Sequence, residues 1–212
     1  MALFSLVGLE GASKTTSTNT IMQVFREAGL PLSVFREPGG TPMAEALRTI
    51  HKGMWEEKIS SDTEQLLMFA GRVQLYLNQV VPGIKQGHVL LDRCWWCTYA
   101  YQVHKRLDNR LFGHLVELIE RMQPLDEVLF LDVDPAAGLL RARGRGELDR
   151  IEQQHLSFFE NAREGYRTLA GRYPNATTID ANGPIEQVQA AVREWALAQV
   201  QKYRHETHGS TA

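Results

Sequence analysis

The chain has few cysteines, no long apolar run and no excess of charge of either sign. Its two cysteines among 212 residues, Cys94 and Cys97, lie too close together to cross-link a fold, and a reducing compartment would keep them as thiols. No stretch approaches the roughly 20 apolar residues of a membrane span, and the N-terminus lacks a basic region followed by a cleavable apolar one. We therefore expect a cytoplasmic protein that does not bind membranes.

The charge balance also argues against nucleic acid as a partner. Lys and Arg number 23 against 25 Asp and Glu, so the formal net charge is -2, which provides no polycationic surface for nucleic acid. Apolar residues at 43% and charged residues at 23% are ordinary for a globular protein. A chain of 212 residues buries a full core, and we expect a single domain over residues 1–212.

Short apolar runs alternate with amphipathic segments along the chain. Five of these runs have the length and composition of strands buried on both faces, as in a parallel sheet: residues 3–7, 32–35, 88–92, 127–133 and 176–180. Apolar residues recur at helical spacing in three segments: Ile21, Val24, Phe25 and Ala28; Phe112, Leu115, Val116 and Ile119; and Ile185, Val188, Val192 and Trp195. This order predicts an α/β fold with a five-stranded parallel sheet, and functional groups at the carboxyl ends of the strands. The polar tail, residues 205–212, is expected to fray.

The segment after the first predicted strand has the composition of a phosphate-binding loop. Polyphosphate needs free backbone N–H groups at a helix N-terminus, a lysine that reaches the outer phosphates and a hydroxyl for Mg²⁺. Lys14 supplies the charge and Thr15 the hydroxyl, while Ser13 stands where the usual pattern has glycine. A turn that binds nothing is the alternative. The whole segment comprises Gly8, Leu9, Glu10, Gly11, Ala12, Ser13, Lys14, Thr15 and Thr16.

Two further segments place arginines at the ends of predicted strands. Arg36 opens the sequence REPGGT after the second strand, and Arg93 follows Asp92 at the end of the third. Arginine suits phosphate because its planar guanidinium donates two parallel hydrogen bonds. A surface ion pair would explain either arginine alone.

Taken in order, these motifs resemble the thymidylate kinase family over nearly the whole chain. The segments that carry the resemblance are GLEGASKTT, REPGGT, Arg72 in GRVQL, Asp92-Arg93 with Ala100-Tyr101-Gln102, LDVDP, and RARGRGELDRIE over residues 141–152. The resemblance implies the P-loop nucleoside monophosphate kinase fold with a lid at about 141–152. It also implies ATP as donor, Mg²⁺, a deoxynucleoside monophosphate acceptor, above all dTMP, and a homodimer. The chain is most similar to bacterial members whose helper arginine lies in the lid.

The resemblance assigns roles that the chemistry explains, because phosphoryl transfer brings two anions together and cations must surround both. Lys14 would bind the donor phosphates, and Thr15 would hold Mg²⁺ with Asp92 orienting its shell. Arg93 would clamp the acceptor phosphate, and Glu10 would meet the acceptor sugar or the water shell of the metal. Arg145, with Arg143 close behind, would close over the transferred group, although the lid arginines read alone would be solvated charges. The implied acceptor residues are Arg36, Pro38, Met68, Phe69, Arg72, Arg93, Cys97, Thr98, Tyr101 and Gln102.

Departures from the family pattern gather where the acceptor base should lie. Met68 takes the place of a stacking phenylalanine, and a slip of one residue would give that role to Phe69. Residues 94–97 replace a Tyr or His, two variable residues and a Ser, while Val103 and His104 replace glycines and Val7 a glutamate. A kinase retuned for dUMP or a 5-substituted deoxyuridylate is therefore one alternative. A nucleotide-binding protein without turnover, suggested by Ser13 and Val7, is another.

The spacing of Cys94 and Cys97 allows other interpretations. Two thiolates could bind zinc with His88 or His104, but a structural site needs four ligands and the second matched pair is missing. A redox pair would show the same spacing. Packing is the simpler role for both cysteines, and a core position is expected for Trp95 and Trp96.

Overall fold

The computed structural model describes residues 1–104, 109–143, 150–151 and 153–208, and its strands form one parallel sheet in the order β2-β3-β1-β4-β5. The strands are β1 (Leu3–Gly8), β2 (Leu32–Arg36), β3 (His88–Asp92), β4 (Glu127–Asp132) and β5 (Ala176–Asp180). The predicted five-stranded parallel sheet is confirmed. Strands β1 and β2 each extend one residue further than predicted, and β4 ends one residue earlier.

The helices alternate with the strands along the chain. They are α1 (Lys14–Glu27), α2 (Pro42–Lys52), α3 (Ser61–Leu75), α4 (Val81–Ile84), α5 (Trp95–Thr98), α6 (Arg110–Met122), α7 (Pro135–Arg143), α8 (Leu156–Ala170) and α9 (Ile185–His208). Two wider π-helical turns, η1 (Tyr76–Val80) and η2 (Tyr99–Val103), continue α3 and α5. No helix over the described part of the chain combines the length and apolar content needed to cross a membrane.

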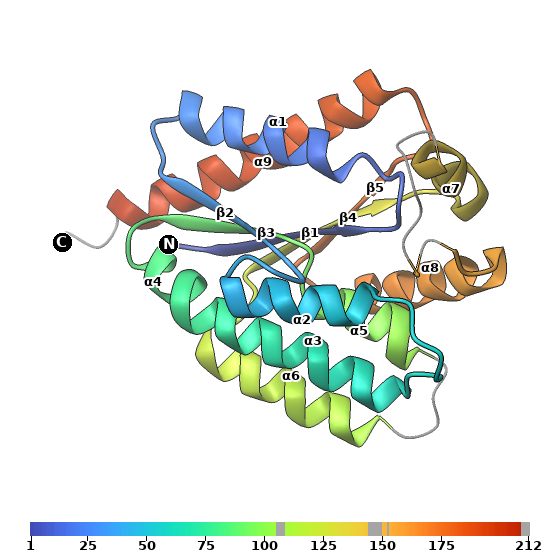
Figure 1. Cartoon of the computed structure of the whole chain (residues 1–212). Coiled ribbons are helices and arrows are strands. Elements are labelled where there is room, and N and C mark those ends of the chain that lie inside the picture. Colours follow the sequence, from blue (N-terminus) through green and yellow to red (C-terminus); the bar gives the residue numbers. More distant parts are fainter. Residues whose placement is uncertain (105–108, 144–149, 152, 209–212) are drawn as a thin grey trace.

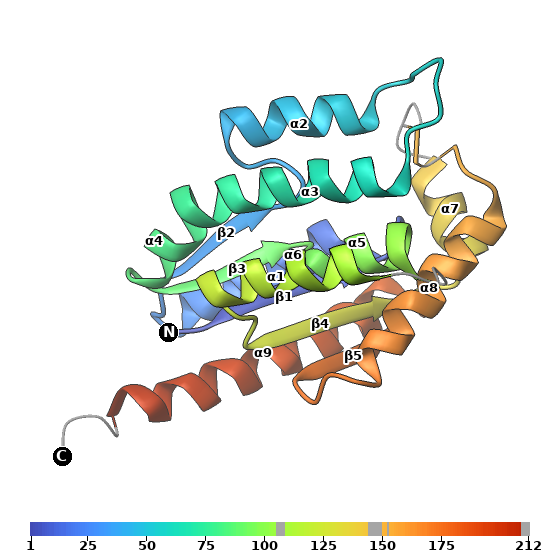
Figure 2. The same ribbon diagram turned by 90° about the horizontal axis from the view of Figure 1, so that it is seen from below.

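Helices cover both faces of the sheet. Helices α1 and α9 pack together on one face, and α3, α5, α6 and α8 lie on the other (Figure 1). Helix α2 packs on α3, outside the layer next to the sheet (Figure 2). The loops that follow β1, β2 and β3 therefore meet at one edge of the sheet, with α7 and α8 beside them (Figure 1).

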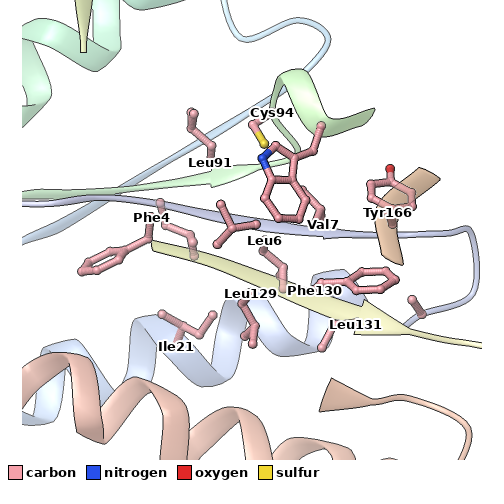
Figure 3. Packing of buried hydrophobic residues seen from close by; sticks show 14 of the residues in the cluster. Phe4, Leu6, Val7, Ile21, Leu91, Cys94, Leu129, Phe130, Leu131 and Tyr166 are labelled. Carbon is pink, nitrogen blue, oxygen red and sulfur yellow. The ribbon is translucent and has the colours of Figure 1, made fainter. Parts of the chain in front are cut away.

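The neighbouring strands β1 and β4 are buried over their whole length. Phe4, Leu6 and Val7 of β1 are fully buried and pack between the two helical layers, with Leu129 and Phe130 of β4 beside them (Figure 3). Because Val7 has no access to solvent, a carboxylate at this position would be buried and would need a partner. The valine is therefore explained by its packing.

The predicted last helix is confirmed: Val188, Val192 and Trp195 of α9 are buried, and Ile185, its first residue, is 40% exposed. The helix continues to His208, and fraying of the tail, residues 205–212, stays a prediction. Tyr203 is buried and Lys202 pairs with Glu127, so tertiary contacts hold the helix close to its end.

Candidate active site

A cavity of about 440 Å³ lies at the carboxyl ends of the central strands and joins most of the predicted site residues. It is bounded by segments far apart in the sequence: the loop after β1, the loop after β2, helix α3, the end of β3 with α5 and η2, and the end of α7. The predicted residues that line it are Glu10, Gly11, Ser13, Lys14, Thr15, Arg36, Pro38, Met68, Arg72, Asp92, Arg93, Cys97, Thr98, Tyr101 and Gln102.

The loop between β1 and α1 is held by its own lysine. Nζ of Lys14 donates hydrogen bonds to the backbone oxygens of Gly8, at 2.9 Å, and Leu9, at 2.7 Å. Burial, together with the positive charge of Arg93, lowers the pKa of Lys14 to about 8. The ammonium group is therefore placed at the helix N-terminus, in surroundings that favour a nearby anion.

Close backbone contacts explain the glycines of this loop. A Cβ atom on Gly11 would lie 2.1 Å from the backbone oxygen of Gly138 in α7, so only glycine fits there. Ser13, by contrast, has φ 65 and ψ 27, a left-handed conformation that glycine adopts more easily than serine. The departure from the usual motif thus places a side chain at a strained backbone position.

The other residues predicted to bind ATP contribute in different ways. Leu9 and Ala12 have buried side chains, so only their backbone atoms are available to a ligand. Thr16 is exposed in the first turn of α1 and does not border the cavity.

Arg93 and Glu10 form an ion pair inside the cavity. NH2 of Arg93 lies 3.0 Å from Oε1 of Glu10, and the hydroxyl of Tyr101 donates to Oε2 of the same carboxylate at 2.7 Å. Burial alone would raise the pKa of Glu10, but the charges of Arg93 and Lys14 lower it. Arg93 has φ 77, a conformation uncommon outside glycine, and such backbone strain is concentrated at functional sites.

Thr15 and Asp92 offer oxygen atoms next to the phosphate loop, and both line the cavity as well as a second pocket. Oδ1 of Asp92 is withdrawn from solvent and has no hydrogen-bond partner among the described residues. An unpaired carboxylate oxygen beside a hydroxyl fits Mg²⁺, a cation that prefers oxygen ligands and keeps several waters. In the described part of the chain, no three His, Cys, Asp or Glu side chains gather closely enough to hold a metal by themselves.

The segment after β2 is fixed by polar contacts with α2. NH2 of Arg36 pairs with Oε1 of Glu45 at 2.7 Å, and the same oxygen accepts from the backbone N–H of Gly40 at 2.7 Å. Arg48 of α2 donates to the backbone oxygen of Pro38 at 2.8 Å. These contacts set the position of Arg36 and Pro38 on the cavity wall.

Arg72 reaches the far end of the cavity from α3. Its Nε lies 2.6 Å from Oε2 of Glu37, and both terminal nitrogens lie 3.5 Å from Oγ1 of Thr98. The Arg72 guanidinium also stacks over the Phe69 ring, with its central carbon 4.5 Å from the ring centroid. The pair is almost fully buried, and burial raises the pKa of Glu37 against the opposing charge of Arg72.

Met68 and Phe69, the two candidates for contact with the acceptor base, have different surroundings. Met68 borders the cavity, whereas Phe69 does not and packs edge-on against Phe112, with ring centroids 6.0 Å apart. Phe69 faces the core and supports Arg72, so Met68 is the one of the two that a ligand in the cavity could contact.

The lid can be described only in part. Arg145 lies outside the described residues, as does the side chain of Arg143 at the end of α7. Arg141 donates to the backbone oxygens of Ala181 and Asn182, at 2.9 and 3.1 Å. Arg150 pairs with Glu64 and donates to the backbone oxygen of His51. Arg141 and Arg150 are therefore bound to neighbouring elements, although Arg141 stays exposed to solvent.

The cysteines lie between the core and the cavity. Both are free thiols: Cys94 is buried, and Cys97 faces the cavity near Arg93, with Sγ 4.0 Å from NH1. Burial raises the pKa of the Cys94 thiol, which disfavours the thiolate that zinc binding requires. Trp95 and Trp96 belong to the core, as predicted.

Some lining residues were missed by the sequence analysis, and two kinds of signal point to them. Glu37 lies inside the REPGGT motif itself. Arg48, His51 and Lys52 recur at helical spacing directly after that motif, as a basic face of a helix does. The full set is Glu37, Arg48, His51, Lys52, Cys94, Ala142 and Ile151.

Comparison with known proteins identifies the family of the chain. The sequence model of a family described as thymidylate kinase matches residues 6–192. A thymidylate kinase of Alteromonas mediterranea is 44% identical over 187 residues, which cover 87% of this chain and 84% of that protein. The chain therefore belongs to the thymidylate kinase family, and it is a nucleoside monophosphate kinase that uses ATP.

Proposed function

We propose that the protein transfers the γ-phosphoryl group of ATP to the 5′-phosphate of dTMP and forms dTDP and ADP. One observation carries the proposal: a single cavity joins the Lys14 loop to Arg93 and to the buried Arg72. The first suits a donor polyphosphate, the second an acceptor phosphate and the third the polar edge of a base. Membership of the thymidylate kinase family and the related Alteromonas thymidylate kinase support the same reaction.

On the donor side, the backbone N–H groups of the loop and the Lys14 ammonium bind the β- and γ-phosphates. Lys14 exchanges its hydrogen bonds with the Gly8 and Leu9 oxygens for contacts with phosphate. Thr15 and Asp92 would hold Mg²⁺, which when bound would neutralise charge on the phosphates. The other backbone groups of the donor subsite belong to Glu10, Gly11, Ala12 and Ser13.

On the acceptor side, Arg93 binds the 5′-phosphate and draws it toward the γ-phosphoryl group. Because catalysis consists mainly of positioning and charge neutralisation, the ion pair that orients Arg93 is part of the machinery. Glu10 and Tyr101 then lie beside the sugar, Arg36 and Pro38 near the phosphate, and Met68, Arg72, Thr98 and Gln102 around the base.

For the lid, we carry over the role of Arg145 from the family resemblance. If Arg145 stabilises only the closed reacting complex, Arg145→Ala should lower kcat and leave the acceptor KM close to its starting value. Steady-state kinetics with Arg143→Ala as the matched control test this. A silent Arg145→Ala together with a large loss in Arg143→Ala would assign the role to Arg143.

Two alternatives are kept, each for a specific reason. Met68 on the cavity wall and Cys97 beside Arg93 favour a kinase that also takes dUMP or a 5-substituted deoxyuridylate. The strained Ser13 motivates a nucleotide-binding protein with little turnover. A coupled assay of ADP release with ATP against dTMP, dUMP, 5-substituted dUMP, dCMP and dGMP tests both. ADP release with dTMP supports the proposal, and none with any acceptor would overturn it.

We further propose that the kinase acts as one domain and forms a homodimer. Leu66 on α3, Leu77 on η1 and Leu118 on α6 are 51%, 56% and 44% exposed, and α3 packs against α6. Leu66 and Leu77 are separated by 11 positions, about three helical turns, and so share one side. A second copy that covers these leucines would bury them. The free thiols of Cys94 and Cys97 agree with a cytoplasmic location.

A further inference from the structure

Cys94 and Cys97, the only cysteines of the chain, lie on one turn that follows β3. The backbone N–H of Cys97 donates to the backbone oxygen of Cys94 at 3.0 Å. A hydrogen bond of this span closes a turn whose first and last Cα atoms lie within about 7 Å of each other. Disulfides join Cα atoms that are about 4.4–6.8 Å apart, so the turn brings the two residues within bonding reach.

The two sulfurs differ in their access to the cavity. Cys94 is fully buried in the core cluster (Figure 3). Cys97 is partly exposed on the cavity wall, where NH1 of Arg93 donates to its Sγ at 4.0 Å. Burial and then the charge of Cys97 raise the pKa of the Cys94 thiol, which indicates that the two sulfurs are close neighbours. A small oxidant that enters the cavity therefore meets Cys97, with a second thiol directly behind it.

Neither packing nor metal binding accounts for this arrangement. Packing explains the buried Cys94, whereas Cys97 presents its sulfur to a cavity beside an arginine. Within the described ranges, no group of three potential metal ligands includes the pair. Two cysteines at this spacing in a βαβ fold are instead typical of thiols that cycle between dithiol and disulfide. In a reducing compartment such disulfides are transient and serve redox sensing.

The turn also connects two parts of the proposed acceptor half. Arg93, which would hold the acceptor phosphate, directly precedes it. Thr98 directly follows Cys97, and its Oγ1 lies 3.5 Å from both terminal nitrogens of Arg72. A disulfide draws Cys97 toward Cys94 and away from Arg93, and the next residue in the chain moves with it. Because a misplacement of about 1 Å can cost about 10²-fold, this change is large enough to impair the acceptor half.

We propose that Cys94 and Cys97 form a redox-sensitive pair, which a hydroperoxide converts into an intramolecular disulfide that weakens binding of the acceptor nucleotide. The effect on binding rests on the proposed function, since it assumes a nucleotide in the acceptor half of the cavity. Formation of the disulfide does not depend on that function and is measured separately.

The oxidation takes two steps. The sulfur of Cys97 attacks the terminal oxygen of the hydroperoxide, so that an S–O bond forms and the O–O bond breaks. The other oxygen leaves with the thiol proton as an alcohol, or as water from hydrogen peroxide, and Cys97 becomes a sulfenic acid. The sulfur of Cys94 then attacks that of Cys97: the S–S bond forms, the S–O bond breaks, and the hydroxyl leaves as water with the Cys94 proton. The peroxide is reduced, and the two thiols are oxidised.

Hydrogen peroxide tests the pair in the unmodified protein. No Lys or Arg lies between the two cysteines, so one tryptic peptide contains both. By mass spectrometry this peptide should lose two hydrogen atoms after treatment and regain them with dithiothreitol. Isothermal titration of the same samples should show dTMP binding at least about tenfold more weakly after oxidation, and ATP much less affected. Dithiothreitol should restore the affinity for dTMP, which separates the disulfide from oxidation of a methionine such as Met68.

Two variants assign the roles of the thiols, each compared with its own untreated form. In Cys94→Ala, prolonged treatment should carry Cys97 to the sulfinic acid, so that the loss of affinity for dTMP persists after dithiothreitol. Cys97→Ala is the matched control, and it should keep its own affinity through the treatment, because its remaining thiol is buried. A loss in Cys97→Ala would assign the effect to another group and overturn the inference.

The unmodified protein decides the question even where a variant does not fold. Two free thiols after treatment, or a disulfide that leaves the affinity for dTMP unchanged, would overturn the inference. Full recovery of Cys94→Ala with dithiothreitol would likewise exclude Cys94 as the second thiol. Failure of the untreated protein to bind any nucleotide would instead contradict the proposed function, while the mass of the peptide would still report whether the disulfide forms.

Discussion

The donor and acceptor halves of the cavity are built in different ways. The proposed donor half is one continuous segment, residues 8–15, which would bind mainly through its backbone and whose lysine closes the loop onto its own carbonyls. The acceptor half collects Glu37, Met68, Arg72 and Thr98 from three separate elements around a buried ion pair. A subsite built from backbone atoms keeps its ligand when side chains are substituted. A subsite built from side chains changes its ligand preference with each substitution. The departures from the family pattern gather accordingly in the acceptor half.

The largest expected effects come from the cations on which both halves depend. Lys14→Met or Arg93→Ala should each lower turnover by about 10²-fold or more, since each charge neutralises a phosphate in the transition state. ADP release at saturating substrates measures this, and thermal unfolding checks that the fold survives. Lys85→Met, a change at an exposed lysine far from the cavity, is the control. A rate near that of the control would remove the residue from the mechanism.

A second test uses pH to distinguish the donor half of the cavity from the acceptor half, because Lys14 belongs to the donor half. With its pKa lowered to about 8, the ammonium is charged below pH 8 and loses its proton as the pH rises through that value. The kcat/KM for ATP should therefore fall above about pH 8, approaching tenfold per pH unit. The affinity for dTMP, measured by titration without ATP, should change less. In Lys14→Arg the fall should move to higher pH, because arginine stays charged. A flat profile to pH 9.5 in the unmodified protein contradicts the assignment.

The difference between contiguous and scattered residues also explains which parts of the molecule were predictable from the sequence. The parallel sheet followed from near-continuous apolar runs such as residues 88–92, and the donor loop from residues that are contiguous, so that local spacing already fixed their geometry. The length of α9 could not be predicted from local pattern, because the end of a helix depends on tertiary contacts such as that between Lys202 and Glu127.

For the acceptor half, the sequence indicated which residues take part but not how they are arranged. Spacing left open whether Met68 or Phe69 faces the ligand, since adjacent helical residues point in directions about 100° apart and the orientation of α3 decides between them. Glu37 was overlooked because its partner in the cavity wall, Arg72, lies 35 positions away in the sequence. Pairings across that separation are set by packing and not by local pattern.

Met68→Phe tests the acceptor half by restoring an aromatic ring. A ring stacked on the base gains planar contact that a flexible thioether lacks, and one aromatic contact is worth on the order of 1 kcal/mol. The ratio of kcat/KM for dTMP over dUMP should therefore rise about fivefold, from near parity in the unmodified protein. Met22→Phe, at an exposed position on α1, should leave the ratio unchanged. Strong preference for dTMP without the substitution, and no change with it, would show that Met68 does not set selectivity.

The smallest effect is expected in the donor loop. Ser13 has φ 65, where a side chain costs about 1 kcal/mol or more, and glycine relieves this strain at the cost of greater freedom in the unfolded chain. Ser13→Gly should therefore raise the free energy of unfolding by less than about 1 kcal/mol and improve kcat/KM for ATP by a small factor. Asn19→Gly, at an exposed helical position of α1, should instead lower stability by a few tenths of a kcal/mol. If Ser13→Gly also destabilises the protein or weakens the use of ATP, the loop is adapted to serine, and the donor half depends on its side chains more than its backbone geometry implies.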